Sequence, residues 1–134
     1  MAESDVELVK QAFEALAQGG YETLLPLIDT DFEMTTPPGL AAEPDTYRGP
    51  EGVRRYFDSF YEAMDEIRFE AHDFRDVGEW VVVSTTLTAR GRSSGLEFDQ
   101  SIVQAWRVRG GKAIRLEVFP DVDEAMAAIE KRAD

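Results

Sequence analysis

Hydrophobic residues recur every three or four positions in four segments of the chain, and this period predicts four α-helices. The first spans residues 5–18, and the others begin at about residues 21, 50 and 121. The second is short and carries Leu24, Leu25 and Ile28 on one side. Pro50 favours the start of the third, because proline is well suited to the first helical position. Two helices are preceded by capping boxes, which satisfy free backbone amides: Ser4 with Glu7, and Asp121 with Glu124.

From residue 67 onward the period changes to two, which predicts an antiparallel meander of four β-strands. These strands cover residues 67–75, 79–90, 96–109 and 112–119, with glycine-containing breaks between them. A shorter strand at 32–35 precedes the segment 37–47, whose three prolines and one glycine predict a surface loop. The resulting order, α-α-β-α-β-β-β-β-α, predicts an α+β fold.

Alternation along each strand separates an inward face from an outward face. In the second strand of the meander the inward positions are Val81, Val83, Thr85, Leu87 and Ala89. In the third they are Leu96, Phe98, Gln100, Ile102, Gln104, Trp106 and Val108, and in the last they are Ile114, Leu116 and Val118. The outward face is less charged than expected for a solvated surface and therefore indicates a partner, at Ser84, Thr86, Thr88, Val103 and Ala105.

The composition narrows the class of partner. A chain of 134 residues fits a single domain over residues 1–134, and 43% hydrophobic residues predict a packed core. The formal net charge of -13 disfavours nucleic acid and anionic membrane surfaces, and no apolar run is long enough for a membrane span. The chain has no cysteine, which favours a cytoplasmic location, and a single histidine, so we expect neither a metal nor a cofactor.

The element order, together with two sequence segments, resembles the NTF2-like superfamily in its SnoaL-like and ketosteroid-isomerase-like branch. The segments are YRGPEGVRRYF at residues 47–57 and WRVRGGKAIR at 106–115. The resemblance implies a cystatin-like cone, in which a curved antiparallel sheet wraps around the N-terminal helices and encloses a mostly apolar pocket. It also implies a homodimer through the convex face of the sheet.

The residues that catalyse ketosteroid isomerisation in that family are replaced in this chain. The resemblance places the catalytic base at Thr36, the oxyanion tyrosine at Phe13 and the oxyanion acid at Gln104. Only Gln104 keeps a hydrogen-bond donor, and Thr36 is no base near neutral pH. Isomerisation by that machinery is therefore not expected. The only histidine, His72, is predicted to be exposed on a strand.

Two functional hypotheses remain open for the predicted pocket. In the first, the pocket binds a small, largely apolar organic molecule that bears oxygen, with or without isomerase, cyclase or hydratase activity by acid-base assistance. In the second, the chain is a non-catalytic binding or dimerisation module whose pocket is filled by its own side chains. A cavity of about 300 Å3 or more favours the first. We expect the pocket to be bounded by Phe13, Met34, Thr36, Tyr56, Phe60, Thr85, Gln100, Gln104, Trp106 and Leu116.

Gln104 separates these hypotheses best, because a buried amide without a hydrogen-bond partner costs about 1–3 kcal/mol. Its partner is either an oxygen of a ligand or a neighbouring group, such as the Tyr56 hydroxyl or an ordered water. The sequence leaves both alternatives open.

Overall fold

The computed structural model describes residues 2–36 and 45–131. Within them the α-helices are α1 (Ala2–Gly19), α2 (Gly49–Ala63) and α3 (Val122–Lys131). The strands are β1 (Ile28–Thr36), β2 (Asp45–Arg48), β3 (Met64–Val77), β4 (Trp80–Gly91), β5 (Glu97–Arg109) and β6 (Lys112–Phe119). Two short 3-10 helices, η1 (Gly20–Thr23) and η2 (Leu25–Leu27), connect α1 to β1.

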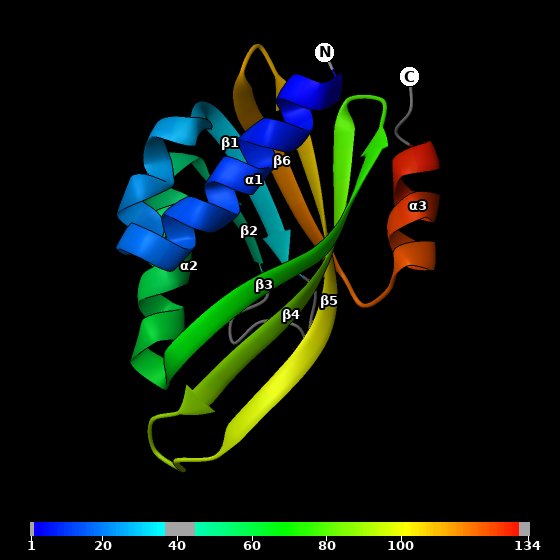
Figure 1. Cartoon of the computed structure of the whole chain (residues 1–134). Coiled ribbons are helices and arrows are strands. Elements are labelled where there is room, and N and C mark those ends of the chain that lie inside the picture. Colours follow the sequence, from blue (N-terminus) through cyan, green and yellow to red (C-terminus); the bar gives the residue numbers. More distant parts are fainter. Residues whose placement is uncertain (1, 37–44, 132–134) are drawn as a thin grey trace.

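The six strands form one curved sheet in the order β2-β1-β6-β5-β4-β3 (Figure 1). Only the β1–β6 pair among these neighbours is parallel. Helices α1 and α2 cover one face of the sheet, and α3 lies against the opposite face. The predicted α+β class, with a sheet wrapped around the N-terminal helices, is confirmed.

Local signals at two helix starts act as the sequence predicted. Gly49 has a φ of +64°, which glycine adopts without strain, and an added Cβ would lie 3.0 Å from the Thr30 carbonyl oxygen. Pro50 and Glu51 then occupy the first turn of α2. At α3 the carboxylate of Asp121 accepts a hydrogen bond of 2.9 Å from the backbone amide of Glu124, as an N-cap does.

The first two predicted helices differ from the observed structure. Helix α1 begins at Ala2, ahead of the predicted Ser4 cap, because Ala2 and Glu3 are strong helix formers that continue its backbone. The predicted second helix is wrong: the chain forms two 3-10 turns there, and Ile28 already belongs to β1. Pro26 has no amide hydrogen to donate, so it interrupts an α-helical ladder at this point.

Strand β2 is an element that the sequence pattern did not predict. It occupies residues 45–48 and pairs antiparallel with β1, so that Tyr47 lies opposite Met34. The last residues of the predicted loop 37–47 are therefore in a strand, whereas 37–44 lie outside the described residues. The Tyr47 side chain is fully buried although it follows a proline-rich segment.

The inward and outward positions on β4 agree with the predicted alternation. Part of the outer face, however, is covered by helix α3. Val82, Val103 and Ala105 pack with Ala125 and Ile129 of α3 in a separate core cluster. Part of the surface predicted to meet a partner is thus covered by the chain's own helix. The sequence missed this because an amphipathic C-terminal helix does not reveal which face of a sheet it covers.

One inward assignment is wrong, and two other inward positions are exposed. The ladder between β5 and β6 shifts register between Arg107 and Val108, and Ala113 instead of Ile114 joins the inner core. Leu96 and Phe98 are 71% and 36% exposed, because the β4–β5 hairpin extends beyond the helices (Figure 1). Alternation predicts the face of a strand but not whether a helix covers it.

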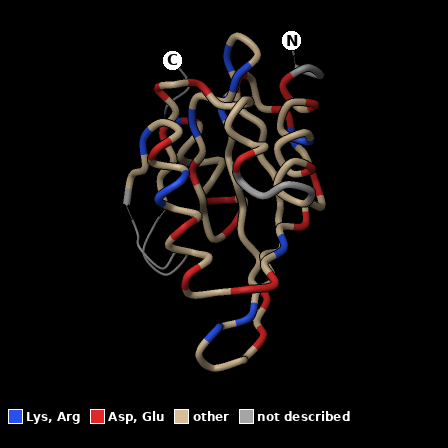
Figure 2. Tube along the Cα trace, turned by 90° about the vertical axis from the view of Figure 1, so that its left-hand side faces the viewer, with Lys and Arg blue, Asp and Glu red and all other residues tan. Residues whose placement is uncertain are grey.

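The acidic residues are spread over many elements along the chain (Figure 2). Several of them form ion pairs with arginines, and Glu79 accepts hydrogen bonds from both Arg107 and Arg109. The Arg107 hydrogen bond holds the pKa of Glu79 below its usual value, with a further contribution from Arg109. No helix in the described parts of the chain is long and apolar enough to cross a membrane.

Candidate functional site

A cavity of about 30 Å3 lies between the inner face of the sheet and the helices. Five of the predicted pocket residues line it: Met34, Tyr56, Gln104, Trp106 and Leu116. The other lining residues are apolar and were not predicted, namely Leu16, Leu24, Phe32, Val53, Phe57, Phe69, Leu87, Ile102 and Val118. Inward alternation already indicated Leu87, Ile102 and Val118, whereas the contributions of the helices and β3 depend on how these elements pack.

The remaining five predicted residues lie elsewhere. Phe13 packs edge to face against Phe74 and lies beside Trp106 in the inner core. Phe60 contacts the Tyr56 ring but does not line the cavity. The other three also lie outside the lining: Thr36 and Thr85, which are buried, and Gln100, which is partly exposed.

Gln104 is held in one orientation by its neighbour two positions along β5. The indole Nε1 of Trp106 donates a hydrogen bond of 2.8 Å to the Gln104 side-chain oxygen. Because an indole N–H can only donate, the atom that it contacts must be the amide oxygen and not the amide nitrogen. The amide NH2 group of Gln104 has no hydrogen-bond partner among the described residues, and it belongs to a residue that lines the cavity.

Tyr56 contributes the second polar group of the cavity wall. Its ring packs edge to face against those of Tyr47, Phe57 and Phe60, with centroid distances of 5.3, 5.0 and 5.9 Å. Burial raises the pKa of Tyr56 to about 12, with a smaller contribution from Tyr47. The phenol therefore stays protonated near neutral pH and can donate a hydrogen bond. Among the described residues we find no hydrogen-bond partner for it.

The cavity wall has no group suited to act as a base near neutral pH. None of the described residues that line it is histidine, aspartate or glutamate. His72 is exposed, as predicted, and its Nε2 lies 2.6 Å from the Thr86 hydroxyl. Within the described residues no group of three or more His, Cys, Asp or Glu side chains is placed to hold a metal ion. The geometry is suited to hydrogen bonding and apolar contact.

Comparisons with known proteins place the chain in a family. The family model of the SnoaL-like domain matches residues 9–116. The chain therefore belongs to the SnoaL-like domain family. No curated protein matches it in sequence.

Solved structures share the fold at low identity. An NTF2-like protein of unknown function from Burkholderia pseudomallei has 22% identity and a TM-score of 0.80, over 92% of this chain and 95% of that one. TerC, co-crystallised with polyporic acid, has 22% identity and a TM-score of 0.79, over 95% and 98%. A protein with a ketosteroid-isomerase-like fold from Catenulispora acidiphila, in complex with trimethylamine, has 14% identity and a TM-score of 0.75, over 90% of both chains.

Proposed function

We propose that this SnoaL-like protein binds a small, largely apolar organic molecule and holds one of its oxygen atoms at Gln104 and Tyr56. The observation that carries this proposal is the oriented amide of Gln104. Its oxygen is taken by Trp106, so its NH2 group is left as a donor in a wall that is otherwise almost entirely apolar. An oxygen atom of a ligand, or a water in its absence, satisfies that donor.

The size of the cavity limits what can enter it. A volume of about 30 Å3 has room for one or two atoms of ligand beyond the hydrogen-bonded oxygen unless side chains move. Met34 is the most adaptable lining residue, because methionine has three rotatable bonds and no branch. The ligand must therefore be narrow at its oxygen-bearing end, or it must displace side chains such as Met34.

The small volume of the cavity favours a second candidate function, a non-catalytic module. The cavity is far smaller than the pockets of about 300–1,000 Å3 that usually hold drug-sized ligands. Aromatic rings of Tyr56, Phe57 and Trp106 occupy much of the inner face. This filling supports a non-catalytic module in which the pocket has become part of the core.

Isomerase, cyclase or hydratase activity would have to rest on two donors. Tyr56 and Gln104 can polarise a carbonyl group, but neither side chain removes a proton readily near neutral pH. We therefore place ligand binding ahead of catalysis. The ligands of two neighbours, polyporic acid with TerC and trimethylamine with the Catenulispora acidiphila protein, support the idea that this fold accommodates small organic molecules.

The predicted homodimer and cytoplasmic location also stay proposals. Because α3 covers Val103 and Ala105, a second copy would use an uncovered part of the sheet, and we place it on the outer face of β1, β2 and β6. This face carries Glu33, which pairs with Arg48 at 3.8 Å and with Arg115 at 3.7 Å. Opposite charges side by side suit a self-complementary, two-fold interface. A monomer by light scattering at every concentration would contradict the dimer.

Thermal-shift assays on two glutamine variants test the proposed function. The probes are small ketones, lactones and epoxides, and a ligand at about a hundred times its dissociation constant adds roughly 2.7 kcal/mol to stability. We expect stabilisation of the wild type to be lost in Gln104→Leu and kept in Gln100→Leu, a matched change on the same strand outside the cavity lining. Absence of stabilisation by every probe would favour the self-filled module.

A further inference from the structure

A second hollow lies beside the cavity at the edge of the sheet, where α1 and α2 meet β3, the last strand in the sheet order. It is a groove of about 400 Å3 lined by Leu16 and Ala17 of α1, Tyr61 of α2 and residues 67–70 of β3. Leu16 and Phe69 line both the groove and the cavity, so these two side chains lie at the boundary between them. The groove, unlike the cavity, has the volume of about 300–1,000 Å3 that is usual for small-molecule sites.

The register of β3 on β4 divides the groove lining between the two faces of the sheet. Phe69 pairs with Leu87 and packs with the inner core. Arg68 and Glu70 pair with threonines of β4 and are exposed on the outer face, so they form only the outer rim of the groove. One positive and one negative side chain leave this rim without net charge. The formal net charge of -13 also disfavours an organic anion, so an uncharged ligand suits the groove best.

Aromatic rings connect the groove to the cavity on the inner side of the sheet. Tyr61, in the groove, packs against Phe57, in the cavity wall, with ring centroids 5.9 Å apart. Phe57 in turn packs edge to face against Phe69, which belongs to both hollows, at 6.5 Å. Burial raises the pKa of Tyr61, with a smaller contribution from Asp58, so its phenol is uncharged near neutral pH. Three neighbouring uncharged rings therefore lead from the groove to the cavity.

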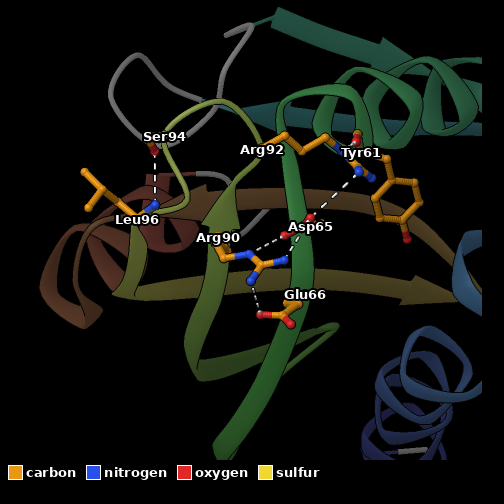
Figure 3. A network of polar contacts seen from close by, with 7 residues as sticks. All are labelled: Tyr61, Asp65, Glu66, Arg90, Arg92, Ser94 and Leu96. Atoms are coloured by element: carbon orange, nitrogen blue, oxygen red, sulfur yellow. Dashed lines mark hydrogen bonds and ion pairs between the residues drawn. The ribbon is translucent and has the colours of Figure 1, made fainter.

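A network of hydrogen bonds and ion pairs holds the Tyr61 end of the groove in place (Figure 3). Arg92 donates a hydrogen bond of 2.6 Å to the backbone carbonyl of Tyr61, which joins the end of α2 to the β4–β5 hairpin. Arg92 also lies 3.8 Å from Asp65, whose carboxylate accepts hydrogen bonds of 3.0 and 3.3 Å from Arg90. The hydrogen bond from Arg90 holds the pKa of Asp65 below its usual value. These charged groups are engaged with one another, and the wall that they hold is preformed.

We infer that one ligand occupies both hollows and that it is an uncharged methyl ketone with a long apolar chain. Its carbonyl oxygen accepts from Gln104, and its methyl group fits the small space that remains in the cavity. Its chain passes between Leu16 and Phe69, which move apart, and lies in the groove against Ile67 and Tyr61. This inference rests on the proposed function, because the carbonyl end occupies the same cavity.

Calorimetric titration with a series of methyl ketones tests the inference. The probes run from 2-butanone to 2-nonanone, and each adds one methylene group at the end away from the carbonyl. We expect affinity to rise about two- to fourfold per methylene once the chain reaches the groove, because each methylene leaves water for an apolar surface. Nonanoate, of the same chain length but charged, should bind less tightly than 2-nonanone. Equal or tighter binding of nonanoate would contradict the uncharged class of ligand.

Three variants separate the groove from the cavity. Ala17→Trp should remove the gain in affinity with chain length, because Ala17 lines the groove but not the cavity and a tryptophan there fills the groove. Ala17 is exposed, so the fold accommodates the larger side chain. Ala127→Trp is the matched control, at an exposed alanine of α3 on the opposite face of the sheet, and should keep the full gain. Gln104→Leu should weaken the binding of every ketone.

The outcomes distinguish the inference from the proposed function. If ketones bind but their affinity does not rise with chain length, or if Ala17→Trp keeps the full rise, the inference is wrong and the proposed function stands. If no ketone binds, the inference is wrong, and the lactones and epoxides of the thermal-shift assay decide the proposed function. If ketones bind and Gln104→Leu weakens none of them, both are wrong.

Discussion

The two faces of strands β4 and β5 are buried by different kinds of side chain. On the outer face, Val82 and Ala105 pack against Ala125 and Ile129 of α3 in a mainly aliphatic cluster, in which Trp80 is the buried aromatic residue. On the inner face, Trp106 and a set of phenylalanine and tyrosine rings pack against α1 and α2, and a cavity remains there. Where α3 covers the outer face the strands are packed by a helix, whereas the inner face keeps a cavity.

The difference offers a physical reason for the cavity on the inner face. Rigid rings hold edge-to-face contacts at centroid distances of about 4.5–7 Å, which restricts how they can fill the space between the helices and the sheet. The inner face also holds Gln104, whose amide is fixed by Trp106 and cannot turn to fill the gap. Ring geometry and an oriented amide together preserve the space at which we place the ligand.

Removal of a large side chain from each face should give the largest effect. Trp106→Ala should lower the free energy of unfolding by about 3–5 kcal/mol, because it enlarges the existing cavity and frees the Gln104 oxygen. Ile129→Ala should cost about 2 kcal/mol, since α3 is a short terminal helix that can move toward the sheet. Urea denaturation measures both, and an equal or larger loss for Ile129→Ala would contradict the comparison.

Addition of the same methylene group to each face should give an intermediate effect. Val82→Ile, beneath α3, should cost about 1–3 kcal/mol by overpacking. Val118→Ile adds its methylene toward the cavity and should change stability by less than about 0.8 kcal/mol. Both variants are compared with the wild type by urea denaturation, and equal losses would mean that the inner face is as closely packed as the outer one.

Alkaline titration concerns the inner face alone. The pKa of Tyr56 is raised to about 12 in the folded chain, so its contribution to stability is complete below pH 10.0 and is lost as the pH rises toward 12. The wild type should therefore lose stability more steeply over this range than Tyr56→Phe. The matched control is Tyr61→Phe. Burial also raises the pKa of Tyr61, and this variant should differ less from the wild type. Parallel curves for wild type and Tyr56→Phe would contradict the burial of this phenol.

The site was predictable to the extent that it depends on strand alternation. Gln104 and Trp106 lie two positions apart on one strand, so their common face follows from the period of two. Leu16 and Phe69 were not predicted as lining residues, because they come from a helix and an edge strand whose approach depends on packing. The choice of Trp106 instead of Tyr56 as the partner of Gln104 also depends on side-chain rotamers, which a sequence pattern does not define.

The sequence by itself determined the α+β class, the starts of α2 and α3, and the inward face of β4 and most of β5. These follow from local propensity, capping and alternation, which act over a few residues. Only the tertiary structure decided the β2 pairing, the shift of register that turns Ala113 inward, and the closure of the outer face by α3. It also decided the size of the cavity, because that depends on the packing of segments that are distant in sequence.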